Sequence, residues 1–347
     1  MKPVYLVLLP ILFFFLISPV FAADFRNGNV LLKLDEKTGR FSLYLAGENT
    51  EEKPQALFFD QDPRTSSLSV FIDDRSYKLG DSSSFRIRLG EDNENPSFIF
   101  ESVFLKVTEQ FSFIGDNNST DVNGIRIAIT LENLTDRQMS SGARFLLDTY
   151  LGERVSGSSL FTNIRAVSSE ILLTKADNDN YWIDRNSRYA LNGSLFTGSP
   201  LDPDSVHIAN WKRLNDVSWK ASYQSGRNFN FPPYSTGDSA VCYYFDVRPL
   251  NSGEKRIFGF TLTGLKGDTD SLPVFTASDI SPAGTEKTGD IFTYDVRASR
   301  DQDLAALRDI IAIIDAHINS GSVSEEELAA IESALNKLRI KYGVGAF

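Results

Sequence analysis

The sequence has few of the residues from which common active sites are built. Its 347 residues include one cysteine and two histidines. A single cysteine, Cys242, excludes a disulfide within the chain, and its place in the strand-like stretch AVCYYFDV indicates a buried, unreactive thiol. HExxH, HxH and CxxC are absent, so we expect no zinc site. A nucleophile elbow, a phosphate loop and a dinucleotide-binding fingerprint are also absent, and we expect no cofactor.

The chain also lacks an excess of positive charge, because its formal net charge is -11 at pH 7. Such a surface repels phosphates, and we therefore expect no nucleic-acid partner. Two acidic loops, at 60–63 and 177–180, are conceivable weak calcium sites. Neither has the glycine and the distal glutamate of an EF-hand, and solvated turns explain them better.

The clearest apolar run lies at the start of the chain. Lys2 precedes an apolar stretch over 4–17, and Val20 and Ala22 fit the small-residue pattern of a signal-peptidase site. We predict a signal peptide over 1–22 and an exported protein, periplasmic or secreted, with no membrane span after cleavage. An uncleaved anchor is the alternative, since an apolar segment of about 20 residues can span a bilayer.

Most of the remaining chain alternates apolar and polar residues, as half-buried β-strands do. The pattern predicts hairpins at 30–45 and at 67–78, the latter turning at Asp73-Asp74. It predicts a single long strand at 96–115 with a bulge or a change of sheet partner within it. For 24–265 we predict a large antiparallel β-sandwich of two sheets.

Asp148 interrupts the apolar run ARFLLDTYLGE at 143–153. If this run forms a hairpin with 124–133, Arg126 falls opposite Asp148, and a slip by one residue would turn one strand inside out. The pairing predicts a cross-strand ion pair worth about 0.2–1 kcal/mol. A structural role for Asp148 is thus favoured, and a catalytic role is the alternative.

Residues 238–265 predict a further hairpin.

The end of the chain changes character. Residues 266–290 are rich in Gly, Pro, Ser, Thr and Asp, which predicts a linker over 266–300 with a possible short strand. A helical hairpin is predicted over 301–343. One face of its first helix is apolar and is the predicted partner-docking surface, for the sandwich, a second copy or another envelope protein. This face consists of Leu304, Leu307, Ile311, Ile314 and Ile318.

All three tryptophans lie between 182 and 219, among other aromatic and hydrogen-bonding side chains. Aromatic faces beside amides, carboxylates and guanidinium groups are what a sugar ring requires. Core packing and a protein interface are the alternatives. The candidate ligand or partner contacts are Tyr181, Trp182, Asp184, Arg188, Tyr189, Trp211, Asn215, Asp216 and Trp219.

The strands IRIAITLEN and RFLLDTYLG, followed by DSAVCYYFDVRPLNSGEKRIF, resemble the β-supersandwich domains related to galactose mutarotase. The resemblance covers about residues 25–265. It implies a fold found in exported bacterial carbohydrate enzymes and in non-catalytic modules. Mutarotases use histidines and a carboxylate base for proton transfer, whereas the β region of this chain contains one histidine, His207. We therefore carry over no catalytic residue.

These features lead us to expect an exported, non-catalytic interaction protein of a cell-envelope assembly. It would dock through its sandwich surface and its helical hairpin. The alternative is a glycan-binding or carbohydrate-active protein that uses the aromatic segment 181–234.

Overall fold

The structure, a computed structural model, describes residues 22–47, 53–90, 94–116, 122–153, 160–267 and 280–282. The predicted helical hairpin with its docking face, most of the predicted linker, and the predicted signal peptide before Ala22 lie outside the described residues. Among the described residues, no helix is long and apolar enough to cross a membrane.

Three antiparallel sheets make up the described part of the chain. The four-stranded sheet runs in the order β1 (Ala22–Asn27), β2 (Val30–Asp35), β3 (Arg40–Leu45) and β4 (Gln55–Ala56). The nine-stranded sheet runs in the order β12 (Leu160–Thr162), β14 (Tyr181–Arg185), β15 (Tyr189–Ser194), β18 (Lys255–Lys266), β10 (Val122–Asn133), β9 (Leu105–Asp116), β8 (Ser97–Glu101) and β7 (Arg86–Leu89), and β19 (Ile280–Pro282) also pairs with β9. The six-stranded sheet runs in the order β13 (Ile171–Thr174), β16 (Ser205–Asn210), β17 (Ser239–Leu250), β11 (Met139–Asp148), β5 (Ser67–Ile72) and β6 (Arg75–Lys78). The short helix α1 (Trp211–Asn215) follows β16, and 3-10 turns occupy η1 (Pro63–Thr65) and η2 (Lys175–Asp177).

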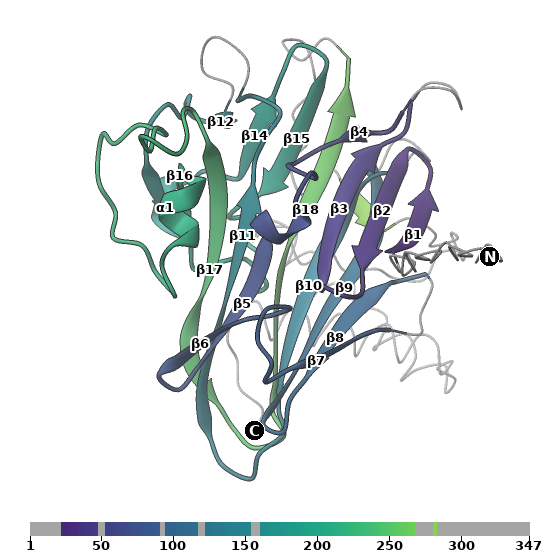
Figure 1. Cartoon of the computed structure of the whole chain (residues 1–347), viewed down its shortest axis with the longest axis vertical. Helices are drawn as coiled ribbons and strands as arrows, with labels where there is room; N and C mark the ends of the chain where they lie inside the picture. Colours follow the sequence, from purple (N-terminus) through teal and green to yellow (C-terminus); the bar gives the residue numbers. More distant parts are fainter. Residues whose placement is uncertain are drawn as a thin grey trace, which may run out of the picture.

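The two smaller sheets lie against one face of the nine-stranded sheet (Figure 1). Phe41 of β3 packs against Phe111 of β9 and Phe145 of β11, with ring centroids 4.9 and 6.0 Å away. Phe145 also packs against Phe260 of β18 at 5.0 Å. These rings join all three sheets in one core. The predicted mainly β, antiparallel fold is confirmed, although the layers consist of three sheets and not two.

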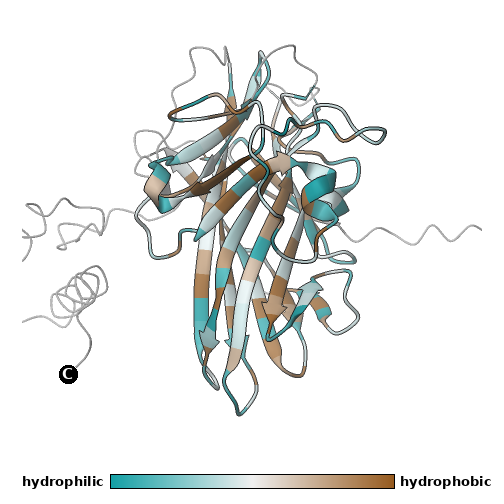
Figure 2. Ribbon diagram, turned by 90° about the vertical axis from the view of Figure 1, so that its left-hand side faces the viewer, coloured by the Kyte–Doolittle hydropathy of each residue, from teal (hydrophilic) through white to brown (hydrophobic). Residues whose placement is uncertain are grey.

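Alternation along each strand accounts for this layering, and Figure 2 shows hydrophobic and hydrophilic residues alternating along the long strands. In β10, Ile125, Ile127 and Ile129 are fully buried, while Arg126 and Ala128 between them are half-buried. Burying one such side chain contributes about 1.5–3 kcal/mol. A strand with this pattern is stable only with its apolar face turned into the core.

The two short-range hairpins are confirmed as β2–β3 and β5–β6. Between β2 and β3, an Asp35 side-chain oxygen accepts the Lys37 N–H at 3.0 Å, and Gly39 takes a φ of 62°. This left-handed conformation carries little steric cost in glycine. Between β5 and β6, Asp73 takes a φ of 51°, which Asp tolerates better than most residues. Local turn chemistry therefore fixes both hairpins.

The prediction of a single strand at 96–115 is wrong. The chain turns at 102–104 and forms the antiparallel neighbours β8 and β9. The Ser102 hydroxyl oxygen accepts the Leu105 N–H at 2.9 Å, which closes the turn. Buried positions change from even numbers, such as Phe100, to odd numbers, such as Val107, across this turn. The drift in apolar parity thus marks a reversal of the chain.

The hairpins predicted for 124–133 with 143–153 and for 238–265 are also wrong. β10 pairs with β9 and β18, and β11 pairs with β5 and β17, so each consecutive strand pair crosses from one layer to the other. In each pair, the apolar faces of the two strands therefore face each other across the core. The two strands do not lie side by side in one sheet. Tyr243 of β17 stacks on Phe260 of β18 at 4.1 Å, and Phe245 stacks on Phe258 at 4.5 Å.

Replacing Phe145 tests the shared core. The side chain is 1% exposed and contacts rings from the other two sheets. Phe145→Ala should lower the free energy of unfolding by about 3–5 kcal/mol, because it opens a cavity between layers. Urea denaturation followed by circular dichroism measures this change. Ile257→Ala, at a half-exposed position of β18, is the control and should change stability by less than about 0.5 kcal/mol. Equal effects of the two variants would contradict a core shared by all three sheets.

Candidate functional site

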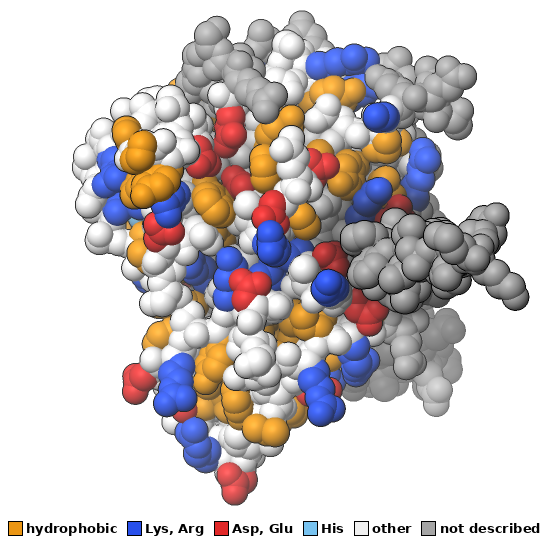
Figure 3. Space-filling view, viewed as in Figure 1, with side chains coloured by type: hydrophobic (Ala, Val, Ile, Leu, Met, Phe, Trp, Pro, Cys, Tyr) orange, Lys and Arg blue, Asp and Glu red, His pale blue; other side chains and the backbone are white. Residues whose placement is uncertain are grey.

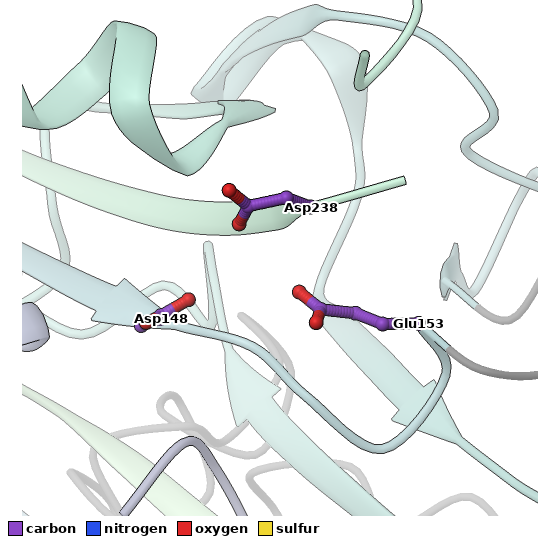
Figure 4. A group of neighbouring side chains, drawn as sticks. All are labelled: Asp148, Glu153 and Asp238. Carbon is purple, nitrogen blue, oxygen red and sulfur yellow. The ribbon is translucent and has the colours of Figure 1, made fainter. Parts of the chain in front are cut away.

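Three carboxylates meet at one end of the six-stranded sheet. Asp148 is the last residue of β11, Glu153 lies in the turn that follows, and Asp238 directly precedes β17. β11 and β17 are antiparallel neighbours with Asp148 opposite Ala240, so the end of one strand meets the start of the other. Oxygens of the three carboxylates lie within 4.8 Å of one another. Figure 4 shows Asp148 and Glu153 pointing toward each other, with Asp238 beside them. We call Asp148, Glu153 and Asp238 the carboxylate cluster.

The turn that carries Glu153 is held in place by Asp184 of β14. Asp184 Oδ2 accepts the N–H groups of Tyr150 and Leu151 at 3.1 and 2.8 Å. Its Oδ1 accepts the N–H of Gly152 at 3.0 Å. Asp184 is buried and belongs to the nine-stranded sheet, so these bonds tie the turn to the opposite layer. The predicted ligand contact Asp184 thus positions the turn.

Further hydrogen bonds fix the neighbouring backbone. The Ser239 N–H donates to Glu153 Oε1 at 3.2 Å, and the Asp148 N–H donates to the Ser66 hydroxyl at 3.0 Å. Trp211 Nε1 donates to the Thr65 carbonyl at 2.9 Å. The side chain of Thr65 hydrogen-bonds the Asp148 carboxylate. Among the predicted aromatic contacts, Trp211 is therefore linked to the carboxylate cluster, with Thr65 as the intervening residue.

Burial and mutual repulsion move the pKa values of the cluster toward neutrality. Burial raises the pKa of Asp148 to about 7, a hydrogen bond with Thr65 opposes the rise, and the charge of Asp238 adds to it. Burial raises the pKa of Glu153 to about 8, and the charges of Asp238 and Asp148 add to the rise. The pKa of Asp238 is raised mainly by burial as well. The pKa values of Asp148 and Glu153 therefore lie near neutrality.

Such a cluster has two chemical options. A protonated member can act as a general acid while an ionised neighbour acts as a base, since neighbouring carboxyl groups with shifted pKa values divide these roles. Fully ionised, the carboxylates could instead hold a divalent cation, because Ca²⁺ prefers carboxylate and carbonyl oxygens. The sequence predicts no metal site.

The predicted ion pair of Arg126 with Asp148 is wrong. Arg126 lies on β10, opposite Ser112 and Thr261 in the nine-stranded sheet, while Asp148 lies on β11 in the six-stranded sheet. The two strands lie in opposite layers and do not pair. Asp148 is therefore free of the structural role that the hairpin predicts.

The nine predicted contacts do not form one aromatic platform. Trp182 is fully buried in the core and donates to the Tyr243 hydroxyl at 2.6 Å. Tyr189 is also buried, and the exposed Arg188 lies 5.7 Å from its ring. Tyr181 is half-buried at the start of β14. These residues and Asp184 belong to the nine-stranded sheet and the turn within it.

The remaining predicted contacts lie on α1 and the segment after it, which covers the outer face of the six-stranded sheet. Trp219 packs on Phe71 of β5, with ring centroids 5.1 Å apart. Asn215 accepts a hydrogen bond from a lysine of β6 at 3.2 Å. Asp216 is exposed and forms an ion pair with Lys212 at 2.8 Å. Of this group, Trp211 alone contacts Thr65 beside the cluster in the described part of the chain.

His207 is buried and bonded to Glu170. Its Nε2 lies 2.9 Å from Glu170 Oε1, and Arg213 Nε donates to Glu170 Oε2 at 2.8 Å. The Gln224 N–H also donates to Glu170 Oε1 at 2.8 Å. Burial lowers the pKa of His207, which favours the neutral imidazole. This network fastens the segment after α1 to β16.

The acidic loops considered for calcium direct their carboxylates to local partners. Asp62 binds Arg64 at 2.8 Å in the first loop. In the second, Asp177 accepts the Thr174 N–H at 2.8 Å, and the buried Asp179 binds an arginine side chain at 2.8 Å. Turn formation and ion pairing account for these residues.

Sequence reasoning singled out Asp148 but missed Glu153 and Asp238. Asp238 directly precedes a strongly apolar strand, and Asp148 ends another. Had the pairing of these strands been recognised, their antiparallel register would have brought both aspartates to the same edge. Glu153 carries no comparable signal, because its place depends on the turn that Asp184 holds.

No protein-family model and no curated protein sequence matches the chain. Its structure is similar to that of a galactose mutarotase-like protein from Lactobacillus casei, with 7% identity, TM-score 0.43, and coverage of 70% of this chain and 100% of that chain. It is also similar to an aldose epimerase homologue from C. elegans, with 10% identity, TM-score 0.41, and coverage of 71% and 99%. A third similar structure is alpha-N-acetylgalactosaminidase from Bifidobacterium bifidum, with 12% identity, TM-score 0.41, and coverage of 70% and 36%.

The weak resemblance to galactose mutarotase-like folds that the strand pattern predicts is confirmed. Identity and TM-score are both low, so the likeness carries no argument about activity. The function must be argued from the residues of this chain.

The raised pKa values predict that stability falls as pH rises. A carboxyl group with a raised folded-state pKa stabilises the fold below its unfolded pKa of about 3.8, and this contribution is lost as pH rises through the folded value, about 7 for Asp148. The melting temperature should be lower at pH 8.5 than at pH 5. Asp148→Asn, which mimics the neutral form, should reduce this difference. Asp216→Asn, at an exposed position, is the control and should leave it unchanged. A pH dependence identical in all three proteins would contradict the assignment.

Proposed function

We propose that the chain is an exported saccharide-binding β-sandwich protein whose carboxylate cluster moves protons to and from a bound sugar. The observation that supports this best is the meeting of three carboxylates, from β11, its following turn and the start of β17, with pKa values raised toward neutrality. Perturbed titration of neighbouring groups is typical of sites of proton transfer.

The spacing of the cluster suits acid–base chemistry on sugars. Glycoside hydrolysis uses two carboxyl groups about 5–9.5 Å apart, depending on the mechanism. One oxygen from each carboxylate of the cluster lies within 4.8 Å of the others, slightly closer than the lower limit of this range. A protonated member would donate to a ring or glycosidic oxygen, and an ionised neighbour would accept a proton from a hydroxyl group or water.

An aromatic pair, the exposed Tyr234 and the half-buried Phe231, lies in the segment that leads to Asp238 and supports sugar binding. Tyr234 is 69% exposed and lies 5.9 Å from Phe231, with Lys212 Nζ 5.0 Å from the Tyr234 ring. The next residue, Ser235, hydrogen-bonds the carboxylate of Asp238. In Figure 3, an apolar patch bordered by basic side chains lies at the upper left, over α1. Aromatic faces of this kind stack on the CH groups of a sugar ring.

Two substitutions separate binding from proton transfer. Tyr234→Ala should weaken saccharide binding about tenfold, since a stacking contact contributes about 0.5–1.5 kcal/mol. Asp148→Asn should keep binding and lower turnover about 100-fold or more. Titration of a glycan panel by calorimetry measures binding, and NMR of the anomeric protons measures turnover. The proposal fails if the wild-type protein neither binds nor converts any saccharide of a broad panel.

Matched controls exist for both substitutions. Tyr223→Ala removes another exposed tyrosine of the same segment and should leave binding unchanged. Asp216→Asn neutralises an exposed carboxylate directly after α1 and should leave turnover unchanged. Loss of binding in both tyrosine variants would point to a disturbed segment and not to a stacking contact.

A second proposal is docking to an envelope partner through the predicted helical hairpin. It rests on the sequence, in which the apolar face from Leu304 to Ile318 follows a linker. Deletion of 301–347 should abolish co-purification with a partner, or self-association, while the β domain keeps its melting temperature. In-cell crosslinking with mass spectrometry checks this. A full-length protein that is monomeric and crosslinks to nothing would refute it.

A further inference from the structure

Two cationic side chains flank the aromatic pair of Phe231 and Tyr234. Lys212 Nζ lies 5.9 Å from the centre of the Phe231 ring and 5.0 Å from that of the Tyr234 ring. The guanidinium carbon of Arg227 lies 5.6 Å from the centre of the Phe231 ring. Two positive charges thus meet at one aromatic pair, on a chain whose formal net charge is -11. The local charge of this patch is opposite to that of the whole protein.

The two cations differ in what they bind. Lys212 Nζ lies 2.8 Å from the carboxylate of Asp216, so its charge already has a partner. The half-buried Arg227 donates from Nη1 to the side-chain oxygen of Gln224 at 2.7 Å, which is a neutral acceptor. In the described part of the chain, Arg227 forms no ion pair with a carboxylate. Since a guanidinium carries five N–H groups, Arg227 has both charge and donors left for an external anion.

A buried side chain fixes the shape of this patch. Asn210 is 1% exposed, and its Nδ2 donates to the Ser235 hydroxyl at 3.1 Å. Its Oδ1 accepts the Arg213 N–H at 3.2 Å in α1, the helix that carries Lys212. The Ser235 N–H donates to the Phe231 carbonyl at 3.1 Å, which closes the turn between the two rings. The aromatic turn and α1 are therefore held to each other, and a preformed site spends little binding energy on ordering.

We propose that the saccharide bound at this patch carries a carboxylate, as a uronic acid does. This inference rests on the proposed saccharide-binding function. The sugar ring stacks on Tyr234, and the Arg227 guanidinium donates to the sugar carboxylate. A planar guanidinium matches a carboxylate with two parallel N–H bonds, which are short and charge-assisted. The carboxylate cluster cannot hold this group, because its acids repel a further negative charge.

Calorimetry of the full chain with matched ligands tests the inference. Fragments of polygalacturonate, alginate and hyaluronan are each compared with their methyl esters, which keep the sugar rings and linkages but lose the charge. One or more of the acids should bind about tenfold more tightly than its ester, because a hydrogen bond to a charged group is lost in the ester. Added salt should weaken binding of the acid and leave binding of the ester unchanged.

Substitutions of Arg227 assign this preference to one side chain. Arg227→Gln should abolish the preference for the acid and leave the affinity for the ester unchanged. Arg227→Lys, which keeps the charge but loses the planar fork, should give an intermediate preference. Arg88→Gln, at an exposed position of β7, changes the net charge equally and should keep the full preference. Should Arg227→Gln fail to fold, the wild-type comparison and Arg227→Lys decide the question.

The outcomes separate this inference from the function on which it rests. Equal binding of acids and esters would overturn the inference and leave the saccharide-binding function standing. Tighter binding of a sulfated oligosaccharide or of inorganic phosphate than of every uronic acid fragment would also overturn it, because the patch would then be a general anion site. A protein that binds no saccharide, charged or neutral, would refute the proposed function and the inference together.

Discussion

The stacking of aromatic rings between the layers is the interaction on which the rest of the structure depends. Tyr243 on Phe260 and Phe245 on Phe258 hold β17 against β18 across the core. The consecutive strands β17 and β18 thereby belong to opposite sheets, and Phe145 connects the same ring cluster to β11. Within its own sheet, each of these two strands then pairs with a strand from a distant part of the chain, β18 with β10 and β17 with β11. This is how β11 and β17 become neighbours.

The carboxylate cluster is a consequence of that pairing. Backbone hydrogen bonds between β11 and β17 bring Asp148 and Asp238 together despite their repulsion, and Asp184 adds Glu153 by holding its turn. Burying these groups disfavours their charged forms, which raises their pKa values. The sheets thus supply the free energy that keeps three acids close, and the cluster gains a proton affinity near neutrality that an exposed acid lacks.

The sequence predicts the elements whose structure is decided locally. The hairpins β2–β3 and β5–β6 follow from alternation and from turn residues such as Gly39 and Asp73. Alternation and turn residues do not predict where the chain passes from one sheet to the opposite one. A strand turns the same apolar face inward whether its successor lies beside it or opposite it, so a period of two is compatible with both. The ion pair of Arg126 with Asp148 failed for this reason, and Glu153 and Asp238 were missed.

Several of the buried polar groups lie along one seam of the fold. The four-stranded and six-stranded sheets share no strand pairing, and the start of β5 lies where they meet. Thr65 and Ser66 contact Asp148 there, and Ser66 also lines a small cavity together with Arg40 and Glu109. A seam without a backbone ladder leaves room for side-chain hydrogen bonds that a continuous sheet would exclude. Proteins normally bury apolar side chains, and buried polar groups that depart from this pattern are expected at functional sites, where function requires them. The position of the cluster at the end of this seam therefore follows from how the three sheets meet.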